Sequence, residues 1–361
     1  MTKEKKLTKE DIVKLVDKPV KLPSMVNDDF DLKKFAKTLK NKFGSVRVPS
    51  MEDDPSEYIS TGNKALDAAL EGGIALGYAA EWAGFSGSGK STLLQILLAD
   101  MQKKYDAVGI WFDREKAWFN KRAEELGINL ANVIVVDPID IQTVPDAEKL
   151  MKEILTTIPD DKYKFIAIDS ISAFAQEGDK ADMGKKAGSL HKLFRAIIPY
   201  VNKRTSLHFA NQKTFKIGVM FGNNETTTGG EAPKYYSTYR LGLNDRMAIK
   251  DDKRGGEITG NWIEAIVDKT RLGPNRRKVI FPFHFKYGIP YYGGYARLLV
   301  NRNYLQAKNK DEFKSLKQNT VKFGDIQFSE HNIEKFLETH PELDFDVYPE
   351  WKEDVKEEKI L

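Results

Sequence analysis

Between Ile59 and Phe209 the chain alternates short apolar segments with longer amphipathic ones. The apolar segments are four to six residues long and predict strands over 78–83, 108–113, 133–137, 165–169 and 207–210. The segments between them carry apolar residues at helical spacing and predict helices over 90–104, 117–126, 147–157 and 188–202. Strands and helices that alternate in this way form a mostly parallel sheet flanked by helices. The expected fold class is therefore α/β.

The flanking regions have other patterns. Residues 1–30 are rich in lysine and weakly patterned, which indicates a mobile basic arm. Apolar residues from Asp31 to Phe43 recur at helical spacing, Gly44 ends this helix, and residues 45–51 alternate like a short strand. The expected division is a helix–strand element over 31–58, a core over 59–295, and a small C-terminal region with an acidic tail over 296–361.

The second half of the core changes in character. Residues 213–234 are rich in Gly, Thr and Asn and have no clear period. A long stretch without regular structure inside a compact domain is usually functional. Residues 239–285 predict antiparallel strands with turns at 251–256 and 273–275.

Composition excludes several kinds of chemistry. The chain has no cysteine, so disulfides, thiolate catalysis, iron–sulfur clusters and cysteine-based zinc sites are ruled out. Its five histidines show no metal-ligand spacing. No apolar run is long enough to cross a membrane and the first residues do not resemble a secretory signal, so we expect a cytoplasmic protein with no membrane partner.

The charge is unevenly distributed. The net charge is +4, but the last 21 residues hold eight acidic and three basic ones, so the tail carries −5 and the first 340 residues about +9. This asymmetry has two interpretations. Either the basic body binds a polyanion and the acidic tail competes with it for the same surface, or the charges belong to a solvated surface and a frayed terminus.

One motif carries specific chemistry. The segment Gly84-Phe85-Ser86-Gly87-Ser88-Gly89-Lys90-Ser91 fits the phosphate-loop pattern G-x-x-x-x-G-K-[ST] and lies between a predicted strand and a predicted helix, as that motif requires. Its backbone N–H groups and the helix N-terminus would attract phosphates. Lys90 would neutralise the β- and γ-phosphates, and the Ser91 hydroxyl would coordinate Mg²⁺.

Two further strands end in carboxylates. Asp169 ends the very apolar segment 165–169 and would reach the metal ion. Glu115 follows the strand 108–113 and could polarise an attacking water as a general base. On spacing alone, Glu115 could equally be a surface or capping residue.

With these motifs in place, the chain resembles the RecA-type homologous recombinases of bacteria and phages. The segments that carry the resemblance are Ile59-Ser60-Thr61-Gly62, Leu66-Asp67-Ala68-Ala69-Leu70, Phe112-Asp113-Arg114-Glu115-Lys116-Ala117 and Ile168-Asp169-Ser170. The most specific match runs from Asn211-Gln212 through Lys216-Ile217-Gly218-Val219-Met220-Phe221-Gly222-Asn223 to Glu225-Thr226-Thr227-Thr228-Gly229-Gly230, and it resembles the second DNA-binding loop of the bacterial proteins. The resemblance covers roughly residues 31–295.

The resemblance implies a RecA-like phosphate-loop ATPase core with an N-terminal oligomerisation arm over 31–58. It implies catalytic roles for Glu115, Lys90, Gln212, Lys269 and Arg271: Gln212 would sense the γ-phosphate, and the last two would reach the ATP of a neighbouring subunit. The implied nucleotide-binding residues are Gly84, Phe85, Ser86, Gly87, Ser88, Gly89, Lys90, Ser91, Thr92, Asp113, Arg122 and Lys234, with Ser91 and Asp169 on Mg²⁺. Glu225 is also placed at the subunit interface.

For DNA, the resemblance implies two groups of contacts. Met183 and Gly184 resemble the first DNA loop, and Arg195 lies on the helix that follows it. The second group is Lys216, Ile217, Gly218, Val219, Met220, Phe221, Asn223, Thr226, Thr227, Thr228, Gly229 and Gly230. Glycine N–H groups would bind phosphates, while Ile217 and Phe221 would lie among the bases. From the residues alone, these two could equally be core residues under a loop.

Some positions depart from the family pattern. Arg122 stands where bacterial members carry an aromatic residue that stacks on adenine, which leaves the base preference open. Lys269 and Arg271 stand where bacterial members have two lysines, whereas phage members show the Lys/Arg form. The compartment would then be a bacterial cytoplasm, or that of a host if a phage encodes the chain.

The implied function is a DNA-dependent ATPase that forms helical filaments on single-stranded DNA and exchanges strands with homologous double-stranded DNA. Its cofactors would be ATP and Mg²⁺, and its partners further copies of itself and loader or single-strand-binding proteins. Two alternatives remain. One is a ring-forming replicative helicase on the same core; the other is a filament scaffold or regulator that binds ATP without useful turnover.

Overall fold

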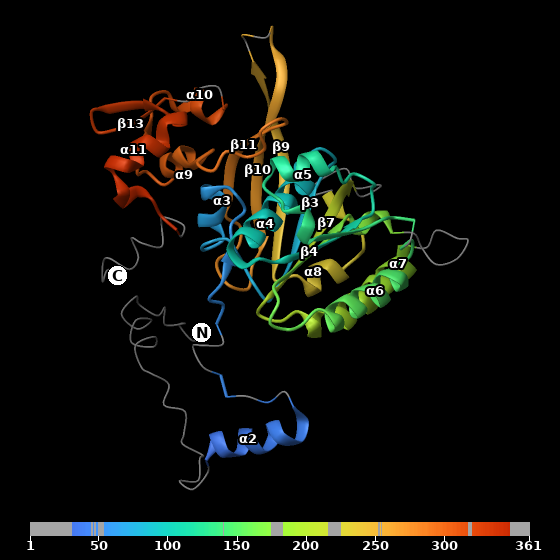
Figure 1. Ribbon diagram of the computed structural model, residues 1–361. Coiled ribbons are helices and arrows are strands. Elements are labelled where there is room, and N and C mark those ends of the chain that lie inside the picture. Colours follow the sequence, from blue (N-terminus) through green and yellow to red (C-terminus); the bar gives the residue numbers. More distant parts are fainter. Residues whose placement is uncertain are drawn as a thin grey trace, which may run out of the picture. The chain divides into compact units, whose positions relative to one another are not determined.

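The computed structural model describes residues 31–44, 46, 48–49, 54–139, 141–174, 183–215, 225–251, 253, 255–316 and 320–346, without the side chains of 183–185. The chain divides into two units, Met1–Asp54 and Pro55–Leu361. The first contains helix α2 (Leu32–Phe43), and the second contains the remaining elements (Figure 1).

Helix α2 is bounded by local capping contacts. The carboxylate of Asp31 accepts a hydrogen bond from the backbone N–H of Lys34, and the helix ends at Gly44, whose φ of 84° favours glycine. This confirms the expected helix. Three of its large apolar side chains are about half exposed or more: Leu32, Phe35 and Phe43. In the expected strand 45–51, the described residues 46, 48 and 49 belong to no strand, and the others lie outside the described residues.

A nine-stranded sheet organises the described part of the second unit, in the order β11-β10-β9-β3-β7-β6-β4-β5 with β8 on β7. The strands are β3 (Ala79–Gly84), β4 (Val108–Asp113), β5 (Val133–Val136), β6 (Lys164–Asp169), β7 (Thr205–Phe215), β8 (Glu225–Thr227), β9 (Tyr239–Asp251), β10 (Glu257–Lys269) and β11 (Lys278–His284). The ladders from β9 through β3, β7, β6 and β4 to β5 are parallel. The ladders β9–β10, β10–β11 and β7–β8 are antiparallel. The predicted α/β class is confirmed.

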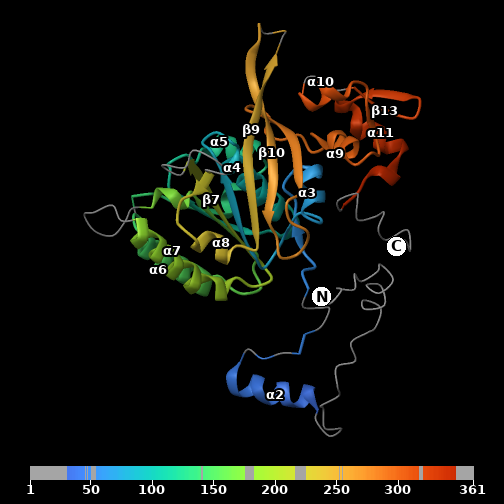
Figure 2. The same ribbon diagram turned by 180° about the vertical axis from the view of Figure 1, so that it is seen from behind.

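Helices cover both faces of this sheet (Figures 1 and 2). They are α3 (Lys64–Ala69), α4 (Lys90–Tyr105), α5 (Asn120–Glu125), α6 (Val144–Thr157), α7 (Met183–Ile197) and α8 (Ala232–Tyr236), with short 3₁₀ turns at Leu130–Asn132, Ile171–Ala173 and Ile198–Tyr200. A small ladder of β1 (Tyr58–Ile59) and β2 (Ile74–Ala75) lies outside the main sheet.

The sheet separates two apolar cores. Because successive strand residues point to opposite faces, Trp111 packs in the cluster that contains the α4 leucines, whereas Ile110 and Phe112 pack in the cluster with α6 and α7. Strands β3 and β6 are buried along their whole length. Full burial explains the apolar run Phe165–Ile168 in β6, whereas β3 includes one buried carboxylate, Glu81.

Several sequence-based boundaries need correction. Residues 213–234, expected to lack regular structure, contain β8 and α8 among the described positions. The helix expected over 117–126 begins only at Asn120, because the backbone N–H groups of Ala117 and Trp118 donate instead to the carboxylate of Asp113. The helix expected from residue 188 already begins at Met183.

Strands β9 and β10 extend beyond the rest of the sheet as a long hairpin (Figures 1 and 2). The turn between them falls in the expected 251–256 region. Because β9 runs parallel to β3 and the next two ladders are antiparallel, β11 also runs parallel to β3. The carboxyl ends of β3 and β11 therefore lie at the same edge of the sheet.

The C-terminal region is a small α/β layer. It comprises α9 (Tyr295–Asn301), β12 (Gln306–Ala307), α10 (Lys310–Lys314), β13 (Thr320–Phe323), β14 (Ile326–Ser329), α11 (Ile333–Thr339) and 3₁₀ turns at Glu330–Asn332 and Pro341–Leu343. Strands β12, β13 and β14 form an antiparallel sheet.

This region contacts the core through cation–π and ion-pair contacts, some of them buried. The guanidinium of Arg297 pairs with the Glu330 carboxylate at 2.8 Å and lies over the Trp262 ring. The acidic residues Asp344 and Asp346 both pair with Lys64 of α3. Burial alone would lower the pKa of Lys64, but these two carboxylates raise it. Within the described part of the chain, no helix is both long and apolar enough to cross a membrane.

Candidate nucleotide and DNA site

The glycine-rich loop joins β3 to α4 and depends on its glycines. Gly87 and Gly89 have φ values of 80° and 85°, which side chains disfavour. At Gly84 an added Cβ would lie 2.3 Å from the Ser88 hydroxyl and 2.9 Å from the backbone oxygen of Leu243. The loop therefore turns its backbone sharply into the start of α4, where N–H groups without helical partners can bind an anion.

Lys90 places its ammonium inside this loop. Its Nζ donates to the backbone oxygens of Gly84 at 3.0 Å and Phe85 at 2.8 Å. Burial lowers the pKa of Lys90, and the charges of Asp169, Glu115 and Asp245 act in the opposite direction. The ammonium thus lies among carboxylates at the opening of the loop, where phosphate oxygens would compete with the two carbonyls for its protons.

Ser91 and Asp169 place two oxygen ligands, a hydroxyl and a carboxylate, beside the Lys90 ammonium. Burial raises the pKa of Asp169 to about 6, and the nearby Glu115 adds to this, while a hydrogen bond with Ser91 and the charge of Lys90 act against it. A buried carboxylate and a hydroxyl are oxygen ligands of the kind that Mg²⁺ prefers. The buried Ser88 hydroxyl, which has no hydrogen-bond partner, also fits a loop built for a polar ligand. These residues therefore fit a magnesium–phosphate group.

Glu115 is held by two neighbours. Its Oε1 accepts hydrogen bonds from the Gln212 amide at 3.0 Å and from the Ser170 hydroxyl at 2.7 Å. Glu115 follows β4 and Ser170 follows β6, whereas Gln212 lies within β7, paired with Gly84 of β3. These strands are neighbours in the sheet, which brings the three side chains together at the loop. The arrangement fixes a carboxylate at the mouth of the phosphate loop.

A cavity of about 300 Å³ opens at this edge of the sheet. It brings together nine residues that the sequence assigned to nucleotide, metal or catalysis: Ser86, Gly87, Gly89, Lys90, Ser91, Thr92, Glu115, Asp169 and Gln212. Two more lining residues, Phe283 and Phe285, were missed. The alternation of Phe281, Phe283 and Phe285 was visible in the sequence, but their position follows only from the direction of β11.

Two assigned nucleotide residues make other contacts and do not line this cavity. The Asp113 carboxylate accepts hydrogen bonds from the backbone N–H groups of Ala117 and Trp118, both at 2.9 Å. The Arg122 guanidinium donates to the backbone oxygen of Lys286 at 2.6 Å and lies 3.6 Å from Glu125. Asp113 thus shapes the turn that carries Glu115, and Arg122 ties α5 to the segment after β11.

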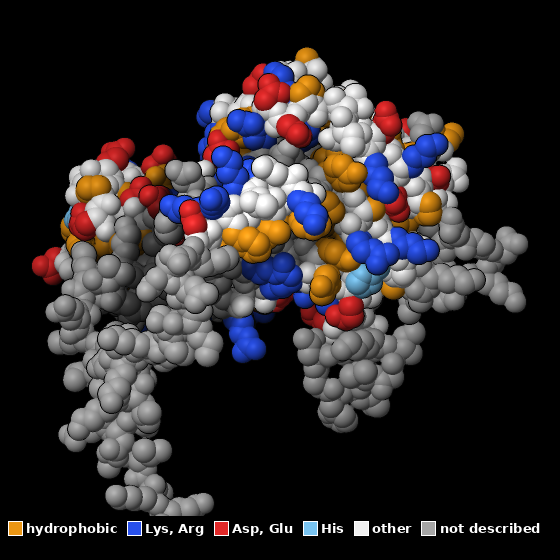
Figure 3. Space-filling view, turned by 90° about the horizontal axis from the view of Figure 1, so that it is seen from below, with side chains coloured by type: hydrophobic (Ala, Val, Ile, Leu, Met, Phe, Trp, Pro, Cys, Tyr) orange, Lys and Arg blue, Asp and Glu red, His pale blue; other side chains and the backbone are white. Residues whose placement is uncertain are grey.

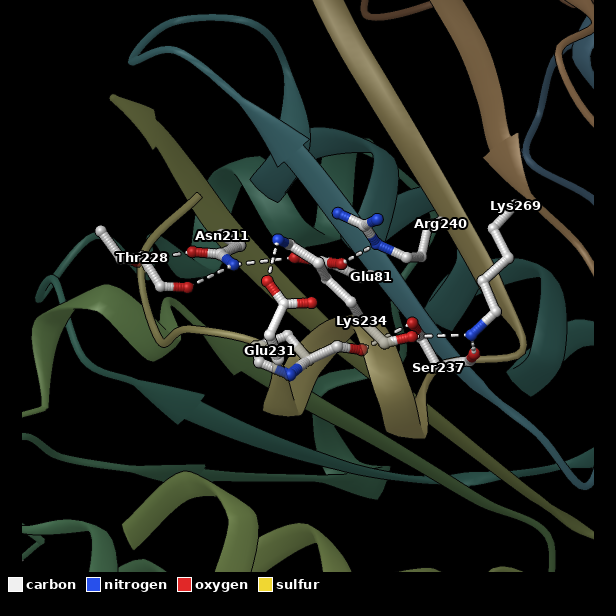
Figure 4. Close-up of polar contacts among 9 residues, drawn as sticks. Glu81, Asn211, Thr228, Glu231, Lys234, Ser237, Arg240 and Lys269 are labelled. Atoms are coloured by element: carbon white, nitrogen blue, oxygen red, sulfur yellow. Dashed lines mark hydrogen bonds and ion pairs between the residues drawn. The ribbon is translucent and has the colours of Figure 1, made fainter. Parts of the chain in front are cut away.

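A buried polar network joins β3, the strand before the phosphate loop, to β7 and β9 (Figure 4). Glu81 is fully buried in β3, and its carboxylate binds Arg240 of β9 and the Asn211 amide of β7, the latter at 2.8 Å. Asn211 also donates to the Thr228 backbone oxygen at 3.0 Å and accepts from the Thr228 hydroxyl at 2.6 Å. The residue before Gln212 is thereby fixed to the strand that enters the phosphate loop. The far end of the glycine- and threonine-rich segment is fixed by the same side chain.

The expected inter-subunit cations gather around α8 rather than around the chain's own cavity. Lys269 Nζ donates to the backbone oxygens of Lys234 at 2.7 Å and Ser237 at 2.8 Å, as Figure 4 shows, and Arg271 donates to the Tyr235 backbone oxygen at 3.0 Å. Lys234 itself pairs with Glu231. Carbonyls at the end of a helix favour such cations.

Of the expected DNA residues, Lys216, Ile217, Gly218, Val219, Met220, Phe221 and Asn223 lie outside the described residues. Met183 and Gly184 begin α7, and Arg195 lies exposed on that helix. Thr226 and Thr227 belong to β8, which pairs with β7 through Lys213↔Thr227 and Phe215↔Glu225. The segment 216–224 is therefore flanked by the two strands of a hairpin.

The turn at Gly229 and Gly230 packs against α7. A Cβ added at Gly229 would lie 2.7 Å from Leu190, and one at Gly230 would lie 2.9 Å from Ala187. Close packing on this helix, together with φ values of 85° and 68°, explains why both positions require glycine. The two regions assigned to DNA thus meet here.

Figure 3 shows dispersed positive charge on one face of the described surface. On the face seen from below in Figure 3, Lys and Arg side chains occur in several groups, with hydrophobic side chains between them and acidic ones nearby. Dispersed cations interleaved with apolar groups suit contact with a polyanion or with another protein surface.

The parallel sheet, the glycine-rich loop after β3 and the Lys–Ser start of α4 define a phosphate-loop nucleotide-binding protein. The family model of the RecA N-terminal domain matches residues 31–290. Protein RecA of Colwellia psychrerythraea is 31% identical over 321 residues, which cover 86% of this chain and 88% of that protein. Protein RecA of Gluconobacter oxydans is 33% identical over 317 residues, which cover 84% of this chain and 87% of that protein.

The chain therefore belongs to the RecA family. This membership confirms the family inferred from the sequence motifs. It places the chain among the DNA- and ATP-binding ATPases of recombination and repair.

Proposed function

We propose that this protein is a DNA-dependent ATPase that forms helical filaments on single-stranded DNA and exchanges strands with a homologous duplex. The observation that carries the proposal is the hydrogen bond between Gln212 and Glu115. It joins the expected catalytic carboxylate to β7, the strand that continues into the β7–β8 hairpin. Hydrolysis and DNA binding can be coupled through a contact of this kind.

In the proposed hydrolysis, Glu115 accepts a proton from the attacking water. Its hydrogen bonds from Gln212 and Ser170 orient the carboxylate for this task. The Lys90 ammonium, which donates hydrogen bonds to the carbonyls of Gly84 and Phe85, would donate to phosphate oxygens instead and neutralise the phosphate charge. Mg²⁺, held by Ser91 and Asp169, supplies further charge neutralisation when bound.

Filament formation would rest on two features. Lys234 lies in α8, Lys269 and Arg271 donate to backbone oxygens at that helix, and all three would act on the nucleotide of an adjacent copy. Helix α2 exposes Leu32, Phe35 and Phe43. An amphipathic helix with an exposed apolar face is stabilised by packing on another surface, and we assign that surface to the next subunit.

The DNA would lie along the β7–β8 hairpin and the start of α7. Backbone N–H groups and hydroxyls around Thr226–Gly230 would bind phosphates without reading sequence. Base pairing, rather than the protein, would then supply the specificity of strand exchange. The protein would act in the cytoplasm of a bacterium or of a phage host.

The test is ATP hydrolysis with and without single-stranded DNA, with electron microscopy of the same mixtures. We expect strong stimulation by DNA together with helical filaments. Glu115→Gln, which removes the base, is the matched control and should lower turnover by about 100-fold or more. Rings, or turnover indifferent to DNA, would instead indicate a helicase or another ATPase.

A further inference from the structure

Two phenylalanines connect the phosphate loop to the end of β7. The ring of Phe85, in the loop, and the ring of Phe215, the last residue of β7, have centroids 5.1 Å apart and planes tilted by 31°. This geometry falls within the range of attractive aromatic pairs. Phe215 nevertheless remains 60% exposed, whereas Phe85 is half-buried. The contact lies at the rim of the fold and outside its two apolar cores.

The Phe85 side of the contact belongs to the phosphate machinery. The backbone oxygen of Phe85 accepts a hydrogen bond from Lys90 Nζ. The same oxygen also accepts a hydrogen bond from the Ser88 backbone N–H at 3.3 Å. If the ammonium turned to phosphate oxygens, the Phe85 carbonyl would keep only this longer hydrogen bond and would be held less firmly. The position of the Phe85 ring is therefore sensitive to the occupant of the loop.

The Phe215 side belongs to the β7–β8 hairpin. Phe215 pairs with Glu225 in the last register position of that ladder. Glu225 in turn pairs with Lys213 at 2.9 Å, and Lys213 also donates to Asn244 of β9 at 2.7 Å. A displacement of the Phe215 ring would thus reach both strands of the hairpin at once.

We infer that Phe85 and Phe215 are positioning residues that couple the nucleotide state of the phosphate loop to the DNA affinity of the β7–β8 hairpin. The inference rests on the proposed function and adds a second connection beside the Gln212–Glu115 hydrogen bond. The Gln212–Glu115 hydrogen bond would respond to the γ-phosphate, whereas the Phe85–Phe215 ring contact would respond to the backbone of the phosphate loop. By linkage, the same contact lets DNA alter nucleotide affinity to the same extent.

The measured quantity is the coupling factor, the ratio of Kd values for labelled oligothymidine without and with a non-hydrolysable ATP analogue and Mg²⁺. In the wild-type chain we expect the analogue to tighten DNA binding. Phe215→Ala should reduce the coupling factor about 2- to 10-fold, the value of one aromatic contact. Any loss of DNA affinity should be larger with the analogue than without it, and the DNA-independent ATP turnover should not change.

Two variants serve as controls. Phe215→Tyr keeps the ring and should keep the coupling factor. Tyr200→Ala removes a comparably exposed aromatic side chain (43%) from the 3₁₀ turn before β7, at the opposite edge of the sheet, and should also leave the factor unchanged. If Phe215→Ala lowers the urea midpoint, Phe215→Leu replaces it, because leucine keeps apolar bulk without the ring.

The outcomes separate this inference from the proposed function. If nucleotide does not change the DNA affinity of the wild-type chain and DNA does not change its ATP turnover, the proposed function is refuted. The inference is then refuted as well. If the analogue tightens DNA binding to the same extent in the wild-type chain and in Phe215→Ala, the inference is refuted and the proposed function is not. Equal loss of DNA affinity with and without nucleotide would make Phe215 a direct DNA contact and overturn its coupling role.

Discussion

His208 of β7 makes the stability of the core depend on pH. The side chain is fully buried, and burial lowers its pKa from 6.5 to about 3. Trp82 Nε1 lies 3.2 Å from His208 Nδ1, and Ser206 Oγ lies 2.7 Å from Nε2. Because an indole N–H can only donate, Nδ1 must accept, and the ring is neutral with its proton on Nε2. A second proton on Nδ1 would face the indole N–H directly.

The sign and size of the effect follow from this geometry. Below the unfolded pKa of about 6.5 the unfolded chain binds a proton at this site while the folded chain does not, so stability falls as pH falls. The loss continues until the folded pKa of about 3 is reached. Between about pH 7 and pH 5, this one residue should remove roughly 2 kcal/mol of unfolding free energy.

The assay is urea unfolding followed by tryptophan fluorescence at several pH values, for the wild-type chain and for His208→Gln. Glutamine keeps hydrogen-bonding capacity but cannot titrate. The variant should therefore lose about 2 kcal/mol less than the wild type over the same pH interval, whatever its starting stability. Parallel pH profiles for the two chains would show that His208 does not remain neutral in the fold.

Three further substitutions test the site. Lys90→Ala should abolish ATP turnover, and normal ATPase activity in that variant would refute the phosphate-loop assignment. Asn211→Ala leaves Glu81 and Thr228 without their shared partner and should cost about 1–3 kcal/mol in urea unfolding; an unchanged midpoint would show that this network contributes nothing to stability. Phe221→Ala should weaken single-stranded DNA binding in anisotropy titrations while circular dichroism shows an intact fold, and undiminished affinity would remove Phe221 from the DNA site.

Much of the core could be predicted because its local patterns are strong. Fully buried strands such as β6 read as uninterrupted apolar runs, and the phosphate loop fixes a strand before it and a helix after it. Glu115 and Asp169 could be assigned together because the first follows a strand of one parallel sheet and the second ends another. Gln212, which lies within β7, was assigned from the family resemblance. The convergence of these residues on one cavity is a consequence of the shared strand direction.

The remainder depends on long-range pairing that periodicity does not encode. Phe283 and Phe285 reach the cavity only because two antiparallel ladders return β11 to the direction of β3. The segment around β8 has polar, glycine-rich residues whose pairing with β7 leaves no apolar alternation. The hydrogen bond between Asn211 and Glu81 joins residues 130 positions apart, and no local pattern links the two.

If ATP binding, DNA binding and strand pairing belong to one activity, the protein should exchange strands between circular single-stranded DNA and a homologous linear duplex in the presence of ATP and Mg²⁺. We expect joint molecules that require homology and ATP and that disappear in the Lys90→Ala variant. A protein that binds single-stranded DNA and hydrolyses ATP but yields no joint molecules under these conditions would contradict this expectation.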